Sequence, residues 1–208
     1  MAYFPMFVDM KHKNCLIVGG GLVALRKARM MLEFEANVRV IAPIVTKELY
    51  DVKGISVEER EFSFCDLDGQ DMVIAATNLV ELNEEIATAC KKKGLPVNVV
   101  NRPEAGSFIC PAYEKTGSVV AAFSSGGKNP AITQYLKKKM KPWMTKELAE
   151  QAEYLGSVRP KVKQQLEEKG KRKLAYEQLL AFCQQENRLP KEEEFLQILG
   201  EIEKRDSN

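Results

Sequence analysis

The sequence has 208 residues, of which 45% are hydrophobic and 29% charged, and its formal net charge is +2 at pH 7. This balance is typical of a soluble globular protein with a packed core, and the length suits one large domain or two small ones. A net charge this close to zero gives no general attraction to nucleic acid. No apolar run approaches the roughly 20 residues that a membrane span requires. We therefore expect neither nucleic acid nor a membrane as a partner.

The first hundred residues alternate between short apolar runs and segments with helical spacing. The sequence "CLIV" at 15–18 ends in glycines, as buried parallel strands often do, and apolar residues at helical spacing follow it. Further strands are predicted at 38–42, 55–61 (as an edge strand), 71–77 and 96–100. Such β-α-β alternation predicts an α/β fold, with a parallel sheet covered by helices on both faces.

One of these helices has clear end signals. Asn78 is a candidate N-cap with Glu81 three residues later, which is the spacing of a capping box. Three lysines at 91–93 and then Gly94 close the segment, and both features favour a helix C-terminus. We therefore expect a helix between Asn78 and Gly94.

The pattern changes after residue 106. "SFICPAY" (107–113) and "GSVVAAFSS" (117–125) predict two strands separated by a turn. Asn129 then caps a helix that has Pro130 at its first position. From Thr145 onward the sequence predicts only helices, with breaks at Pro160, Gly170 and Pro190.

The cysteines indicate a reducing compartment. Their number is odd and none belongs to a CxxC pair; they are Cys15, Cys65, Cys90, Cys110 and Cys183. Free buried thiols explain this pattern better than disulfides or a zinc site, so we expect no metal. The first residues lack the pattern of a signal peptide, so we expect a cytoplasmic location.

The glycines after the first strand carry the clearest functional signal. Gly19, Gly21 and Ala24 fit the pattern G-x-G-x-x-G/A between a strand and a helix. In dinucleotide-binding folds the first glycine permits a tight turn, the second lets the backbone approach the pyrophosphate, and the small third residue allows close helix–strand packing. Glycine-rich turns also occur for packing alone, but in this context we predict dinucleotide binding.

One expected part of that motif is missing. An Asp or Glu that binds the adenosine ribose normally ends the second strand, whereas this sequence reads Ile41-Ala42-Pro43-Ile44. A charge-assisted hydrogen bond contributes roughly 1.5–3 kcal/mol, so we expect modest cofactor affinity. No arginine stands at that strand end to bind a 2′-phosphate, so these residues leave open the choice between NAD and NADP.

Several stretches in a fixed order resemble one known family. They are "PMFVDMKHKNCLIVGGGLVALRKARMMLE", "MVIAATN", "NVVNRPEAGSFICPA", "VVAAFSSGGKNPAI" and "VRPKVKQQLEEKGKRK". They resemble precorrin-2 dehydrogenase, which is also the N-terminal module of siroheme synthase. The resemblance covers almost the whole chain and becomes weaker after about residue 180. No methyltransferase module follows, so we expect the stand-alone form.

The resemblance implies a fold, an activity and an assembly. It implies a Rossmann-like NAD-binding domain at 1–111, a small dimerisation region at 112–144 and an all-helical C-terminal domain at 145–208 of a homodimer. The implied reaction is the NAD-dependent oxidation of precorrin-2 to sirohydrochlorin in siroheme biosynthesis. The implied cofactor-binding residues are Gly19, Gly20, Gly21, Leu22, Val23, Pro43, Ile44, Thr77 and Asn78.

The sequence departs from the family at one position. Members with a proposed catalytic carboxylate have an aspartate after "NVV", where this sequence has Asn101. Asparagine cannot accept a proton, so Asn101 cannot act as a general base. Metal insertion must remove two pyrrole protons, whereas hydride transfer needs less help from a base. We therefore predict dehydrogenation with weak or absent ferrochelatase activity, against the alternative of a bifunctional enzyme.

The segment "SSGGKNP" at 124–130 has two interpretations. Ser124, Ser125 and Lys128 beside a helix N-terminus could bind a substrate that bears eight carboxylates. The same residues could form an ordinary strand-to-helix turn. Two non-catalytic functions also stay open: a nucleotide-sensing regulatory module, and a family member that binds cofactor or tetrapyrrole without turnover.

Overall fold

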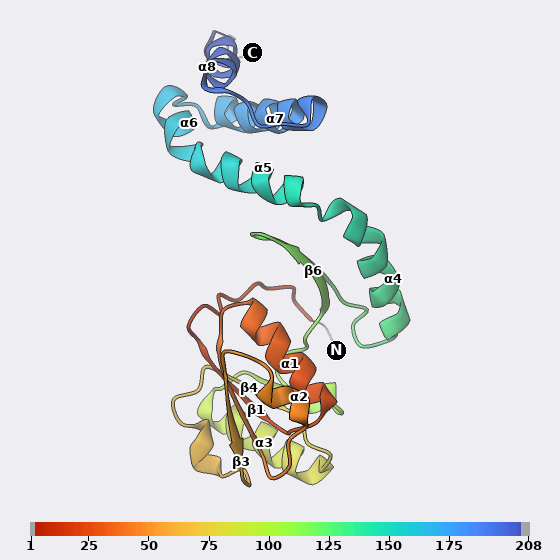
Figure 1. The fold of residues 1–208 in the computed structure, drawn as a ribbon. Coiled ribbons are helices and arrows are strands. Elements are labelled where there is room, and N and C mark those ends of the chain that lie inside the picture. The colour runs from red at the N-terminus through yellow and green to blue at the C-terminus, as the bar shows by residue number, and fades with distance from the viewer. Residues whose placement is uncertain (1–2, 205–208) are drawn as a thin grey trace. The chain divides into compact units, whose positions relative to one another are not determined.

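The computed structural model describes residues 3–204. Within this range the chain forms two compact units. The first comprises the chain up to Cys110 together with Gly126–Lys128, and the second comprises Pro111–Ser125 and the chain from Asn129 onward. Figure 1 shows the elements of both units in chain order.

The first unit is built on a five-stranded parallel sheet with the strand order β3-β2-β1-β4-β5. The strands are β1 (Asn14–Val18), β2 (Asn37–Ala42), β3 (Ile55–Glu59), β4 (Met72–Ala75) and β5 (Val97–Val99). All five predicted strands of this region are present, and β3 lies at the edge, as expected. The sequence prediction of a Rossmann-like α/β fold is confirmed.

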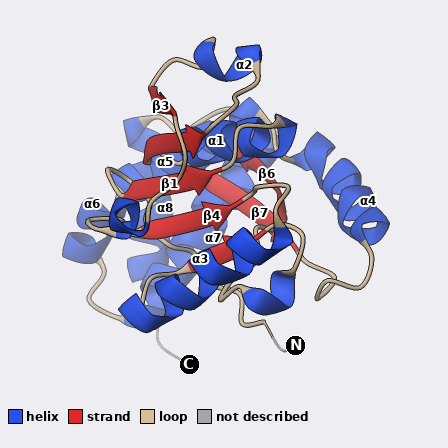
Figure 2. Cartoon of the chain, turned by 90° about the horizontal axis from the view of Figure 1, so that it is seen from below, coloured by secondary structure: helices blue, strands red, loops and turns tan. Residues whose placement is uncertain are grey.

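Helices cover both faces of this sheet (Figure 2). On one face α1 (Leu22–Glu33) packs over Cys15 and Ile17 of β1, and on the other α3 (Val80–Lys93) packs over Leu16 and Val18. Successive residues of a strand point to opposite faces, so the continuous run "CLIV" serves both cores. The short elements of this unit are α2 (Lys47–Tyr50), η1 (Phe64–Leu67) and η2 (Pro103–Ala105).

The predicted start of α3 is wrong by one residue, and its end is right. Leu79, not Asn78, is the N-cap, and no side chain caps this helix. The side chain of Thr77 organises the turn instead, since its hydroxyl accepts a hydrogen bond from the amide of Leu79 at 3.1 Å. Gly94 ends the helix with φ +70°, the left-handed conformation expected of a glycine at a helix C-terminus.

The second unit begins with a two-stranded antiparallel sheet and continues with helices. Its elements are β6 (Ala112–Thr116), β7 (Val119–Phe123), α4 (Pro130–Met140), η3 (Lys141–Trp143), α5 (Lys146–Ser157), α6 (Arg159–Gln165), α7 (Lys169–Glu186) and α8 (Glu192–Glu203). The predicted cap at Asn129 is confirmed, because its side chain accepts from the amide of Ala131 at 2.8 Å. Thr145, which was not predicted as a cap, caps α5. The break predicted at Gly170 lies at 166–168, between α6 and α7, and Gly170 itself is the second residue of α7.

Strand β6 starts five residues later than predicted. The segment before β6 is hydrogen-bonded to β5 of the first unit. The hydroxyl of Ser107 accepts from the amide of Val97 at 2.8 Å. The amide of Ser107 donates to the carbonyl of the same valine at 2.8 Å, and Asn98 donates to the carbonyl of Phe108 at 3.0 Å. These bonds occupy the backbone that the sequence pattern assigned to a strand.

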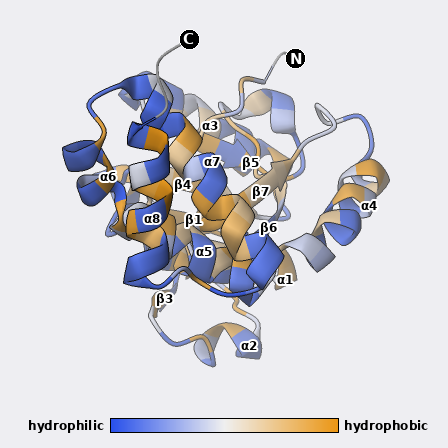
Figure 3. Cartoon of the chain, turned by 90° about the horizontal axis from the view of Figure 1, so that it is seen from above, coloured by the Kyte–Doolittle hydropathy of each residue, from blue (hydrophilic) through white to orange (hydrophobic). Residues whose placement is uncertain are grey.

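The helices of the second unit enclose a separate core. Val162, Leu179, Phe195 and Ile202 are among its buried residues. Figure 3 shows both hydrophobic and hydrophilic residues on α7 and α8. None of the helices in the described part of the chain is long and apolar enough to cross a membrane.

Candidate functional site

A cavity of about 840 Å³ lies where β1, β2 and β4 end. The chain passes from β1 outward to β2 and β3 and then returns to β4, so the cavity is at the point where the strand order reverses. Ligands of open parallel sheets bind at this position, outside the carboxyl ends of the strands. The lining residues are Val18, Gly19, Gly20, Gly21, Ile41, Ala42, Pro43, Ile44, Val45, Thr46, Glu61, Phe62, Ala76, Thr77, Asn78, Leu79 and Leu82.

Gly19 and Gly20 are required by the protein's own backbone. Gly19 has φ +131°, and a Cβ there would lie 2.3 Å from the carbonyl oxygen of Ala76. A Cβ on Gly20 would lie 2.1 Å from the carbonyl oxygen of Ile44. The turn is held in this position because the amide of Thr46 donates to the carbonyl of Gly20 at 2.8 Å. These two glycines therefore let three chain segments approach one another.

Gly21 is different, because no protein atom lies within 4 Å of the position of an added Cβ. This glycine lines the cavity and is the N-cap of α1. The helix has no side-chain cap, and the first three amides of any helix lack an acceptor within it. The open space beside Gly21 and the amides of Leu22 and Val23 are what a pyrophosphate needs.

Exposed apolar side chains stand near the glycine turn. Leu22 is 70% exposed and Ile44 is 79% exposed. Ile44 lines the cavity with Pro43, at the end of β2. Apolar surfaces that flank a polar cradle suit the flat ring of a nucleotide.

Thr77 and Asn78 form the opposite side of the cavity, and a buried residue holds this segment in place. Asn83 is only 1% exposed, and its side-chain oxygen accepts from the amide and hydroxyl of Thr77 at 3.2 and 2.7 Å. Its side-chain nitrogen donates to the carbonyl of Thr77 at 3.0 Å. Sequence reasoning missed Asn83. The sequence did contain a signal for its burial, because Asn83 lies at helical spacing from Ile86 and Cys90 on the buried side of α3.

Sequence reasoning also missed Glu61 and Phe62. Both follow β3 and line the cavity, in addition to seven of the predicted cofactor residues. The segment carries no recognised motif, and only the path of the chain beyond the edge strand brings it to the cavity. Glu61 is the only charged residue of the lining.

Six predicted site residues are not in the lining of this cavity. Leu22 and Val23 follow Gly21 at the start of α1, and the other four are Asn101, Ser124, Ser125 and Lys128. Asn101 is exposed, two residues after β5. The hydroxyl of Ser125 accepts from the amide of Asn129 at 3.1 Å, so it belongs to the turn that starts α4. Ser124 precedes it and is exposed, as is Lys128.

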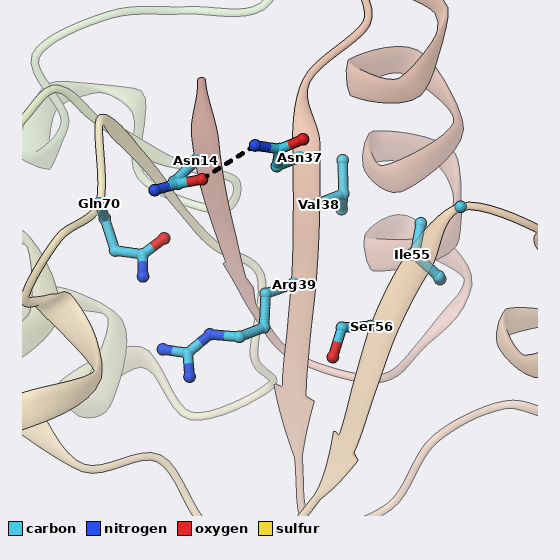
Figure 4. Close-up of a pocket in the computed structure, with 8 residues that line it drawn as sticks. Asn14, Asn37, Val38, Arg39, Ile55, Ser56 and Gln70 are labelled. Atoms are coloured by element: carbon cyan, nitrogen blue, oxygen red, sulfur yellow. Dashed lines mark hydrogen bonds between the residues drawn. The ribbon is translucent and has the colours of Figure 1, made fainter. Parts of the chain in front are cut away.

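A second cavity, of about 400 Å³, lies at the amino ends of β1, β2 and β3 (Figure 4). Asn37 donates to the side chain of Asn14 at 3.2 Å, and the guanidinium of Arg39 extends from β2 on the same face. Arg39 forms ion pairs with Glu58 at 3.2 Å and Asp66 at 3.4 Å, so its charge is neutralised within the protein. This cavity lies at the amino ends of the strands, whereas Rossmann-like folds bind dinucleotides at the carboxyl ends.

Two buried thiols of the first unit, Cys15 and Cys90, are not prepared for nucleophilic chemistry. Burial raises the pKa of Cys15 to about 12 and that of Cys90 to about 11, so both thiols are protonated at neutral pH. Within residues 3–204, no three His, Cys, Asp or Glu side chains are grouped as a metal site requires.

Comparisons with known proteins agree with this geometry. Residues 6–112 match the model of a family described as "Putative NAD(P)-binding". The chain is 34% identical over 184 residues to a siroheme synthase of Nitrosomonas eutropha, 36% over 182 residues to that of Tolumonas auensis and 35% over 182 residues to that of Pseudomonas aeruginosa. These alignments cover 86–87% of this chain and 39% of each relative, so the chain spans about two fifths of their length.

A solved structure has the same fold. The protein described as SirC, precorrin-2 dehydrogenase, superposes with a TM-score of 0.68 over 98% of this chain and 100% of that chain. The two sequences are 21% identical, so this likeness concerns the fold. It includes the Rossmann-like sheet and the helices that follow.

Proposed function

This chain belongs to the NAD(P)-binding family, and from that premise we propose that it is a precorrin-2 dehydrogenase, which forms sirohydrochlorin in siroheme biosynthesis. The open cradle beside Gly21 at the amino end of α1 is the observation that carries the proposal. The siroheme synthase relatives supply the substrate class, because 86% of this chain aligns with part of the relative from N. eutropha. We propose NAD⁺ as the hydride acceptor.

Each wall of the cavity has a role in binding the dinucleotide. The amides at the start of α1, including those of Leu22 and Val23, bind the pyrophosphate, since Gly21 leaves room for it. Pro43 and Ile44 contact the adenosine end at the carboxyl end of β2. Thr77 and Asn78, fixed through Asn83, border the other end of the site.

The reaction removes two hydrogen atoms from precorrin-2. The nicotinamide cofactor, when bound, accepts one of them as a hydride with its electron pair. The other leaves as a proton to water or to a carboxylate of the substrate, since the amide of Asn101 is not a base. The protein contributes the position of the bound dinucleotide at the carboxyl ends of the strands.

We propose Ser124, Ser125 and Lys128 as contacts for the substrate carboxylates. Lys128 supplies positive charge, and α4 begins two residues later with its amino end positive. The Ser125 hydroxyl accepts from the amide of Asn129, which leaves its own proton free to donate. Precorrin-2 bears eight carboxylates and suits such a site.

We also propose a homodimer in the cytoplasm. Large apolar side chains are exposed on α4 and η3, including Ile132, Tyr135 and Trp143, and Trp143 is 74% exposed. Exposed apolar surface of this kind favours a protein–protein contact. The free thiols of all five cysteines suit a reducing compartment.

The test is anaerobic mixing of the purified protein with NAD⁺ and precorrin-2. Absorbance reports NADH and sirohydrochlorin separately, and the two must appear in equal amounts if the proposal is right. Bound NAD⁺ without turnover would contradict the dehydrogenase and indicate a binding protein. A variant with Gly21→Ala serves as the matched negative control.

A further inference from the structure

We propose that Glu61 binds the adenosine ribose and makes the cavity selective for NAD⁺ over NADP⁺. This inference rests on the proposed function, since it concerns the same dinucleotide site. In Rossmann folds an acidic residue at the end of the second strand accepts hydrogen bonds from the ribose hydroxyls. Here β2 ends at Ala42 and is followed by Pro43 and Ile44, so the usual position has no carboxylate.

The register of the sheet brings Glu61 to that same place. Strands β2 and β3 are parallel neighbours, and Ala42 pairs with Glu59 at their carboxyl ends. Glu61 follows two residues later, beyond the end of β2, and it lines the cavity together with Pro43 and Ile44. A carboxylate from the neighbouring strand therefore stands where β2 supplies none.

Anchored residues on both sides fix the position of Glu61. The guanidinium of Arg60 donates to the carbonyl of Glu61 at 2.9 Å and to the two carboxylate oxygens of Asp66 at 2.6 and 2.9 Å. Phe62 packs against the core under α3 and meets Phe64 edge to face, with ring centroids 5.4 Å apart. The backbone of Glu61 is thus held while its side chain is exposed.

The charges around the cavity favour a diphosphate dinucleotide without a further phosphate. The lining residues, all of which lie in the described part of the chain, include no lysine, arginine or histidine. The nearby guanidinium groups are already paired, since Arg60 and Arg39 both bind Glu58 and Asp66. A 2′-phosphate beside Glu61 would therefore meet a negative charge, and no lining residue carries a positive charge to offset it.

The test compares dinucleotide binding in three proteins. NAD⁺ and NADP⁺ are titrated separately into the wild type, Glu61→Gln and Glu59→Gln, and dissociation constants are measured by calorimetry. Glu59→Gln is the matched control, because it removes the same charge two residues away. Glu59 accepts from the hydroxyl of Tyr50 at 2.7 Å and does not line the cavity. Thermal unfolding confirms that each variant is folded, and Glu61→Ser repeats the test with a smaller side chain.

We expect the wild type and Glu59→Gln to bind NAD⁺ at least tenfold more tightly than NADP⁺, the factor that a charge-assisted hydrogen bond supplies. In Glu61→Gln and Glu61→Ser this ratio falls by about tenfold. An unchanged ratio in both Glu61 variants overturns the inference, as does equal binding of the two dinucleotides by the wild type. If NAD⁺ binds selectively through Glu61 but precorrin-2 is not oxidised, the proposed function fails and the inference stands. If the wild type binds neither dinucleotide, both are overturned.

Discussion

Asn83 binds Thr77 through all three polar groups that Thr77 offers. The amide and hydroxyl of Thr77 donate to the side-chain oxygen of Asn83 at 3.2 and 2.7 Å, and the carbonyl accepts from its nitrogen at 3.0 Å. Thr77 has left β4 and cannot use the sheet for these bonds. Asn83, on the buried side of α3, thus determines the shape of the cavity wall that Thr77 forms.

Removing the Asn83 side chain should weaken both folding and dinucleotide binding. Asn83→Ala removes the hydrogen-bond partner of the amide and carbonyl of Thr77, and because Thr77 is half-buried we expect a cost of about 1 kcal/mol. The segment that contains Asn78 is then free to move into the cavity. Urea unfolding measures the lost stability, and titration with NAD⁺ measures the weaker binding.

Asn98 provides the matched control for that experiment. It is also a buried asparagine, 5% exposed, and it donates to the carbonyl of Phe108 at 3.0 Å, away from the cavity lining. Asn98→Ala should lose stability while the affinity of the folded protein for NAD⁺ stays unchanged. Equal losses of affinity in the two variants would show that Asn83 has no specific part in shaping the site.

The three glycines of the turn should respond differently to alanine. The added methyl group of Gly21→Ala contacts no protein atom. We therefore expect the free energy of unfolding to change by less than about 1 kcal/mol, which is typical of replacing glycine by alanine at a helix N-cap. Its methyl group occupies the space for the pyrophosphate, so NAD⁺ affinity should fall by tenfold or more. Calorimetric titration and thermal unfolding measure the two effects.

Gly20→Ala is the opposite case. Its Cβ would lie 2.1 Å from the carbonyl oxygen of Ile44, so the turn must shift and the protein should lose several kcal/mol of stability. If Gly21→Ala destabilised the protein as much as Gly20→Ala, the cradle would be a packing feature and the case for a pyrophosphate site would be lost.

The sequence was sufficient for the sheet and for the glycine turn, because both depend on local patterns. Short apolar runs mark buried strands wherever they occur, and the motif around Gly19 carries its own geometry. Glu61 and Asn83 were missed because their roles arise from tertiary structure. Glu61 reaches the cavity through the register between β2 and β3, and Asn83 acts six residues away from its partner. The late start of β6 has the same origin, since Ser107 bonds to Val97.

The ion pair between Arg60 and Asp66 should make the free energy of unfolding depend on pH in the acid range. Hydrogen bonds from Arg60 lower the pKa of the buried Asp66 carboxyl to about 2, from the usual 3.8. A lowered pKa means that the unfolded chain binds the proton more tightly than the folded protein does. The contribution of the Asp66 charge to the free energy of unfolding is therefore complete above about pH 5 and is lost as the pH falls to about 2. This contribution is at most about 2 kcal/mol.

Asp66→Asn isolates this contribution. The difference in unfolding free energy between wild type and variant, measured in urea, should be largest near pH 6 and should shrink as the pH falls from about 5 to 2. A difference that stays constant over this range would mean that the Asp66 charge contributes nothing to the acid dependence. The same loop carries Glu61, so the variant should also bind NAD⁺ less tightly at neutral pH.

The last prediction concerns iron. Metal insertion into sirohydrochlorin requires the loss of two pyrrole protons, and Asn101 has no group that can accept them. Asn101 is exposed, so an aspartate fits at this position without burial of its charge. We therefore expect the wild type to insert ferrous iron far more slowly than it oxidises precorrin-2, and Asn101→Asp to gain iron insertion with dehydrogenation unchanged within about threefold. Anaerobic absorbance of siroheme measures the first rate, and NADH formation measures the second. Iron insertion by the wild type at the rate of dehydrogenation would show that chelation does not depend on a carboxylate at this position.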